Sequence, residues 1–95
     1  MSLEEARKEI DAVDAELVSL YVRRMRAAES VAAAKRAQGG AVRDAAREQV
    51  VLDRAATAAG PEFADGARRL FSLLMELSRA RQEALLGDSA GDARP

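Results

Sequence analysis

The sequence predicts an all-α protein: a three-helix protomer with a very long first helix, paired in an intertwined homodimer. Three observations support this fold class. Alanine, leucine, glutamate and arginine dominate the 95 residues, and this is a helix-forming composition. Apolar residues recur at spacings of three and four, and no segment shows the alternation of a half-buried strand. The first helical segment is also too long for the rest of the chain to cover.

The first helix is expected to begin after Ser2 and to end at Gly39-Gly40. Ser2 and Glu5 have the S-x-x-E spacing of a capping box, and a double glycine is a strong helix stop. Such a helix has roughly 35 residues and a length of about 50 Å. A compact chain of 95 residues has a radius of gyration of only about 12 Å. We therefore expect a second copy of the chain to cover part of the apolar stripe.

Two shorter helices follow the double glycine. The second is expected over about 44–59, and Gly60-Pro61 ends it. The third is expected to start at residue 61 or 65 and to end at residue 86. Residues 1–86 would then form one helical domain. Residues 87–95 are small and polar, and they are predicted to be a disordered C-terminal tail.

The composition excludes several kinds of site. The chain has no cysteine, so disulfides and cysteine-based metal or redox sites are excluded, and it has no histidine, the commonest general base. We expect neither a metal nor a cofactor. A net charge of −1 provides no strong field for nucleic acid or for a membrane surface. No signal peptide or apolar run of membrane length is visible, so a cytoplasmic location is expected.

Polar residues interrupt the apolar stripes of all three predicted helices. A buried charge without a partner costs several kcal/mol, roughly, even after relaxation. Taken singly, each residue is more simply explained as a paired structural charge or a side chain that reaches solvent. Taken together, they predict a polar cavity with an excess of positive charge inside a helical bundle. The residues are Arg7, Arg24, Lys35, Asp44, Arg47, Glu48, Ser78 and Gln82.

The natural occupant of such a cavity is a small polyanion. Arginine suits carboxylates because its planar guanidinium binds them through two parallel hydrogen bonds. The chain offers few routes to nucleophilic or metal catalysis. What remains is binding, or a reaction that needs only positioning and electrostatic stabilisation. A unimolecular rearrangement of a dicarboxylate meets that requirement.

Over residues 3–86 this arrangement resembles the AroQ-type, all-helical chorismate mutases. The resemblance implies an intertwined dimer with two equivalent active sites. It also implies conversion of chorismate to prephenate by a Claisen rearrangement without a cofactor, as in the shikimate pathway of aromatic amino acid biosynthesis. The matching pattern is Arg7, Ile10, Asp14, Leu17, Arg24, Val31 and Lys35, then VRDAARE at 42–48, then Ser78-x-x-x-Gln82.

The resemblance also implies how the substrate carboxylates are held. Arg24 and Arg47 of one protomer would hold them, and Ser78 would add a further contact. Arg7 would reach in from the long helix of the other protomer. Clamping both carboxylates selects the compact conformer of the substrate, which is the one that reacts.

The remaining residues are implied to act at the ether oxygen and the ring hydroxyl. Lys35 and Gln82 would donate hydrogen bonds to the ether oxygen, where negative charge develops as the C–O bond breaks. Glu48 and the backbone of Asp44 would hold the hydroxyl. The catalytic residues are thus expected to be Lys35, Gln82, Arg24 and Glu48.

Other activities remain open at this point. Two other kinds of enzyme have a fold that this chain also resembles: a mutase acting on 4-amino-4-deoxychorismate and an isochorismate-pyruvate lyase. A helical interaction or regulatory module would explain the amphipathic helices but not the polar residues within their stripes. Bacterial mutases of this kind sometimes need a partner enzyme for full activity, and the sequence does not say whether this one does.

Overall fold

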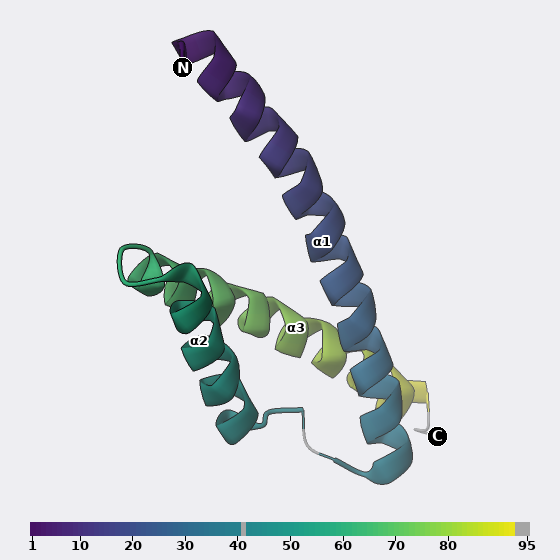
Figure 1. Ribbon diagram of the computed structural model, residues 1–95. Helices are drawn as coiled ribbons and strands as arrows, with labels where there is room; N and C mark the ends of the chain where they lie inside the picture. Colours follow the sequence, from purple (N-terminus) through teal and green to yellow (C-terminus); the bar gives the residue numbers. More distant parts are fainter. Residues whose placement is uncertain (41, 93–95) are drawn as a thin grey trace.

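The computed structural model describes residues 1–40 and 42–92, which form three helices (Figure 1). Helix α1 covers Leu3–Gln38, α2 covers Ala45–Ala59 and α3 covers Ala64–Asp92. No strand occurs within these two ranges. The all-α prediction is confirmed, including the very long first helix.

The ends of α1 follow from local chemistry. Ser2 has an extended backbone, and its hydroxyl oxygen accepts a hydrogen bond from the backbone N–H of Glu5 at 3.1 Å. At the other end, Gly39 adopts a left-handed conformation with φ of 76°, which favours glycine because it has no Cβ. The N–H of Gly39 donates to the carbonyl oxygen of Lys35 at 2.6 Å. Both signals predicted from the sequence therefore operate.

Helix α2 also has the predicted ends. Asp44 is its N-cap, and the side-chain Oδ1 accepts a hydrogen bond from the backbone N–H of Arg47 at 3.0 Å. Gly60, with φ of 83°, follows its last residue. The cap leaves the first turn of α2, with Arg47 and Glu48, directly after the loop from α1.

Helix α3 is longer than expected. It continues to Asp92, so residues 87–92 are helical rather than the start of the disordered tail that the sequence predicted. Gly87 weakens a helix by only about 1 kcal/mol relative to alanine, and it does not adopt the positive φ that would end one. No proline lies between Pro61 and Pro95, so the hydrogen-bond ladder of α3 can continue. Residues 93–95 lie outside the described part of the chain.

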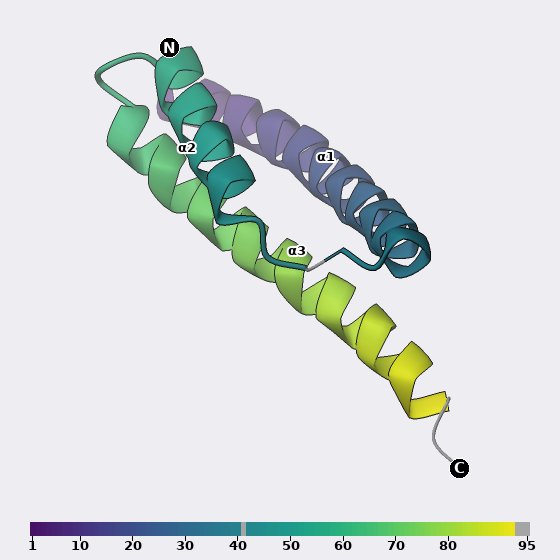
Figure 2. The ribbon, with the colours of Figure 1, turned by 90° about the horizontal axis from the view of Figure 1, so that it is seen from below.

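Helix α3 packs against both α1 and α2, whereas α1 and α2 do not pack against each other within the described ranges. The N-terminal half of α1 extends away from the other two helices (Figure 1). Figure 2 shows α2 lying along the first half of α3, and Figure 1 shows α3 running from α2 to the C-terminal half of α1. The protomer measures 62 × 26 × 15 Å, and its radius of gyration is 17.1 Å, well above the value of about 12 Å for a compact chain.

An ionic cluster ties α1 to α3. The carboxylate of Glu29 accepts hydrogen bonds from Arg26 of the same helix at 2.8 Å and from Arg81 of α3 at 2.9 Å. These hydrogen bonds, first that from Arg26, hold the pKa of Glu29 below its usual value. The cluster fixes α3 beside the second half of α1, where the cavity described below is found.

The protomer buries little apolar surface. Its buried apolar residues are Ala28, Ala32, Ala56 and Met75, all in the region where the helices meet. The large apolar residues along the N-terminal half of α1 remain at least partly exposed; Ile10 is 56% exposed and Leu17 is 51% exposed. A stripe of this kind on a single protomer is typical of a surface that another chain covers.

None of the helices in the described ranges combines the length and the apolar character needed to cross a membrane.

Candidate active site

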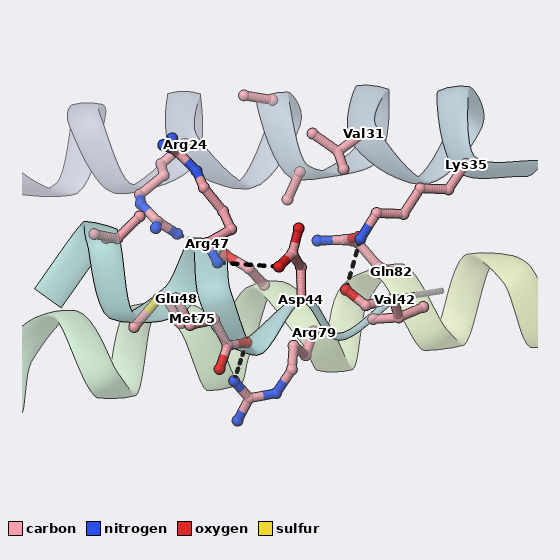
Figure 3. A pocket seen from close by; sticks show the side chains of 14 residues that line it. Arg24, Val31, Lys35, Val42, Asp44, Arg47, Glu48, Met75, Arg79 and Gln82 are labelled. Atoms are coloured by element: carbon pink, nitrogen blue, oxygen red, sulfur yellow. Dashed lines mark hydrogen bonds and ion pairs between the residues drawn. The ribbon is translucent and has the colours of Figure 1, made fainter. Parts of the chain in front are cut away.

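A cavity of about 330 Å³ lies where the three helices come together (Figure 3). This volume is at the lower end of the range for sites that bind small molecules. Seven of the eight residues singled out in the sequence line it. They are Arg24, Lys35, Asp44, Arg47, Glu48, Ser78 and Gln82, and the wall between them includes Val31, Val51 and Met75.

Arg24 enters the cavity from α1 and is tied to α3. Its Nη1 donates to Oγ of Ser78 at 2.6 Å and to the carbonyl oxygen of Leu74 at 3.4 Å. The Ser78 hydroxyl in turn donates to the same carbonyl at 2.9 Å. These bonds hold one edge of the guanidinium, which has five N–H donors in a fixed plane. The remaining donors are available to an anion in the cavity.

Lys35 lies eleven residues further along α1, about 16 Å from Arg24 along the helix axis. Its ammonium donates to the carbonyl oxygen of Val42 at 2.6 Å, so the side chain leans over the loop that follows α1. The same residue accepts the helix-ending hydrogen bond from Gly39 through its own carbonyl oxygen. An ammonium has three donors, and the bond to Val42 uses one of them. Lys35 is thereby oriented at one end of the cavity with donors to spare.

The first turn of α2 supplies three charged residues. The Asp44 side chain caps the helix, while Arg47 is exposed and reaches the cavity from the open side. Glu48 forms an ion pair with Arg79 of α3, at 2.6 Å between Oε2 and Nη1. A second arginine, Arg43, approaches its other oxygen at 3.7 Å. The carboxylate of Glu48 is therefore matched by a guanidinium before any ligand enters.

Sequence analysis missed Arg79, although it lines the cavity. It directly follows Ser78, so it falls beside the apolar stripe of α3 and not on it. A signal was present nonetheless: Glu48 was expected to face inward, and an inward carboxylate needs a cation. This requirement points to an arginine of α3, but it does not choose among Arg68, Arg69, Arg79 and Arg81.

The two residues that interrupt the stripe of α3 are buried, each only 7% exposed. Ser78 is satisfied by Arg24 and Leu74, as described above. The side-chain oxygen of Gln82 is buried and has no hydrogen-bond partner in the described part of the chain. Leaving a buried polar atom unpaired costs roughly 1–3 kcal/mol. The unpaired oxygen is an acceptor, and the NH2 group of the same amide offers two donors, so Gln82 can exchange hydrogen bonds with a ligand in the cavity.

Arg7 is not brought to the cavity of its own protomer. It lies on the exposed N-terminal part of α1, and it is absent from the cavity lining. It precedes Arg24 by seventeen residues, or about 26 Å along the helix axis. An arginine side chain cannot span that distance, so any contact between Arg7 and such a cavity would have to be made by a second copy of the chain.

A second hollow, of about 370 Å³, adjoins the cavity and shares Arg24, Arg47 and Val51 with it. Its other lining residues are mostly apolar and include Ala55 of α2 and Phe71 of α3, with Arg54 at its edge. The cationic cavity is thus continued by a largely apolar surface on the open side of the protomer.

Comparison with known proteins identifies similar chains. The family model described as chorismate mutase type II matches residues 6–83, a range that contains all eight residues predicted from the sequence. A curated protein named intracellular chorismate mutase, from Mycolicibacterium smegmatis, is 34% identical over 79 residues. This match covers 83% of the present chain and 72% of the other protein.

Proposed function

The chain belongs to the chorismate mutase type II family, and we propose that it converts chorismate to prephenate within the cavity described above. An enzyme of this family is an intramolecular isomerase. The observation that carries the proposal is the convergence of Arg24, Lys35 and Arg47 on one cavity that Gln82, with an amide able to donate hydrogen bonds, also lines. Glu48 is already matched by Arg79, so these cations give the cavity an excess of positive charge for a dicarboxylate.

The reaction requires no proton transfer. One C–O bond of the ether breaks while one C–C bond forms within the same molecule, so all atoms and electrons of the product come from the substrate. Negative charge develops on the ether oxygen in the transition state. A donor fixed at that oxygen stabilises the transition state more than the ground state, and this raises kcat as well as affinity.

We assign this role to Lys35 and Gln82. The ammonium of Lys35 is oriented by its bond to Val42 and keeps donors for a ligand. The oxygen of the Gln82 amide has no hydrogen-bond partner in the described part of the chain. The amide can therefore direct an N–H towards the substrate without breaking a hydrogen bond at that oxygen. Arg24 and Arg47 would hold the two carboxylates, with Ser78 steadying Arg24. Glu48 and the backbone of Asp44 would hold the ring hydroxyl.

We further propose that the active protein is an intertwined homodimer in which Arg7 completes the partner's site. Three features support this. The apolar stripe of α1 is exposed, the protomer is far from compact, and a largely apolar hollow adjoins the cavity. An α1 helix from a second copy could cover this hollow and bring its Arg7 to the end of the cavity where Arg24 and Arg47 would hold the substrate carboxylates. We expect the protein to act in the cytoplasm, as the name of its intracellular relative suggests for that protein.

The test is an incubation of the purified chain with chorismate, with the products identified by NMR. Prephenate is expected, and parallel incubations with 4-amino-4-deoxychorismate and with isochorismate test the other two activities of this scaffold. Lys35→Ala should lower kcat/KM by well over tenfold, whereas Lys8→Ala is the matched control. Lys8 is the chain's other lysine; it is exposed and pairs only weakly with Glu4 at 3.9 Å. Mutase activity that survives Lys35→Ala within tenfold, about 1.4 kcal/mol of barrier, would contradict this mechanism.

A further inference from the structure

The ion pair between Glu48 and Arg79 places a fixed positive charge beside the proposed hydroxyl position. The contact joins the first turn of α2 to α3 at 2.6 Å, and Figure 3 shows both side chains below the cavity. Both groups are mostly buried, with 17% of the Glu48 side chain and 25% of the Arg79 side chain exposed. An ion pair with this degree of burial is less screened by salt than a surface pair. The charge of Glu48 is therefore compensated at the site itself.

We propose that Arg79 determines substrate specificity by making Glu48 an acceptor for a neutral hydroxyl and a poor partner for an ammonium group. The inference rests on the proposed function, in which Glu48 faces the ring substituent of the substrate. Arg79 would thereby discriminate between the substrates of two enzymes that share this fold. One carries a hydroxyl at that position, and the other carries an amine, which is protonated near neutral pH.

A hydroxyl suits the paired carboxylate. A carboxylate has about four lone-pair sites on its two oxygens, and the short bond from Arg79 uses one site of Oε2. The other oxygen, Oε1, has only the distant Arg43 at 3.7 Å. It can accept a hydrogen bond from the substrate hydroxyl with no change in the net charge around it.

An ammonium meets the opposite situation. To reach Glu48 it must lie within a few ångströms of the Arg79 guanidinium, and the like charges repel at that distance in a partly desolvated site. The remaining cations of the cavity, Arg24, Lys35 and Arg47, increase the repulsion. The other carboxylate, that of Asp44, is engaged in capping α2. An ammonium would therefore find no unpaired carboxylate at the position of Glu48, and Asp44 is exposed, so that solvent screens its charge.

Without Arg79 the preference should change. Glu48 would then keep only the looser pairing with the exposed Arg43 at 3.7 Å, and an ammonium could form a charge-assisted hydrogen bond with it. The alternative role for the ion pair is purely structural, because it joins α2 to α3. A structural role would lower activity towards both substrates equally, whereas a role in specificity changes their ratio. The ratio of kcat/KM values is therefore the informative quantity.

The experiment measures kcat/KM for chorismate and for 4-amino-4-deoxychorismate with four proteins. The wild type should prefer chorismate by at least tenfold. Arg79→Gln should shift the ratio towards the amine by at least tenfold, or about 1.4 kcal/mol. Arg79→Lys, which keeps the charge, should restore most of the original ratio. Arg81→Gln is the matched control, because Arg81 also pairs with a glutamate on another helix but does not line the cavity.

A double-mutant cycle links the effect to Glu48. In a Glu48→Gln background, Arg79→Gln should change the ratio much less than it does in the wild type, because no carboxylate is left to release and only the direct repulsion between the guanidinium and the ammonium is relieved. An equal loss for both substrates in Arg79→Gln, or the same ratio change in Arg81→Gln, would overturn the inference. So would a wild type that prefers the amine, a result that needs no variant to fold. A protein that converts neither substrate would refute the proposed function itself, so the two failures are distinguishable.

Discussion

The exposed stripe of α1 leads to a quantitative prediction for Leu17. Burying a whole leucine side chain contributes roughly 1.5–3 kcal/mol, and Leu17 is 51% exposed in the protomer. About 1 kcal/mol therefore remains to be gained when a second chain covers it. A two-fold interface contains the residue twice, so Leu17→Ala should weaken the dimer by about 2 kcal/mol, or roughly 30-fold in its dissociation constant.

The assay is sedimentation equilibrium over a range of protein concentrations, with wild type and variant side by side. Ser19→Ala serves as the control, because residue 19 lies 200° around the helix from residue 17, nearly on the opposite face. Circular dichroism checks that both variants keep their helices. A wild type that is a stable monomer at micromolar concentration would refute the reasoning. A dissociation constant that Leu17→Ala leaves within threefold of the wild type, or that Ser19→Ala raises as much, would also refute it.

Three further predictions follow from the site and from the cluster that ties α1 to α3. Arg7→Ala and Lys35→Ala proteins, each nearly inactive, should recover about a quarter of wild-type activity when equal amounts are mixed and the subunits exchange. Half of the dimers are then heterodimers, and each heterodimer has one intact site of its two. No recovery despite verified exchange would exclude a shared site. Gln82→Glu should lose mutase activity near neutral pH and regain part of it at acid pH, where a protonated carboxyl can donate to the ether oxygen; a flat pH profile of kcat/KM would argue against that role. The pKa of Glu29 is lower in the folded protein than in the unfolded chain, so its contribution to stability is present above the unfolded-state pKa and is lost as the pH falls through the folded-state pKa. The melting temperature of the wild type should therefore fall more steeply than that of Glu29→Gln below about pH 4.5. Parallel slopes of melting temperature against pH would contradict this.

The ends of the first two helices could be predicted because they depend on neighbouring residues. The Ser2 cap and the Gly39 stop are interactions within a few residues along the chain, and the sequence shows both partners. The end of α3 was predicted too early. The small, polar residues after residue 86 favoured an end there, but Gly87 does not adopt the positive φ that Gly39 and Gly60 have after α1 and α2.

Most of the candidate site was predictable for a related reason. Helical periodicity places Arg24 and Lys35 on one face, and the VRDAARE segment must follow the turn at Gly39-Gly40. Arg79 was not predictable in the same way. Its pairing with Glu48 depends on how α2 crosses α3, and that crossing is a tertiary feature which the spacing along either helix does not specify. The unsatisfied oxygen of Gln82 likewise becomes visible only once the surrounding atoms are in place.

The central claim is that the cationic cavity catalyses a unimolecular rearrangement through Lys35. The most direct measurement follows chorismate and prephenate by NMR in a solution of the purified wild-type protein and of Lys35→Ala, with no other enzyme added. We expect prephenate as the sole product of the wild type, and we expect Lys35→Ala, still helical, to form it far more than tenfold more slowly. Prephenate formation at similar rates by both proteins, or a different product from the wild type, would contradict that claim.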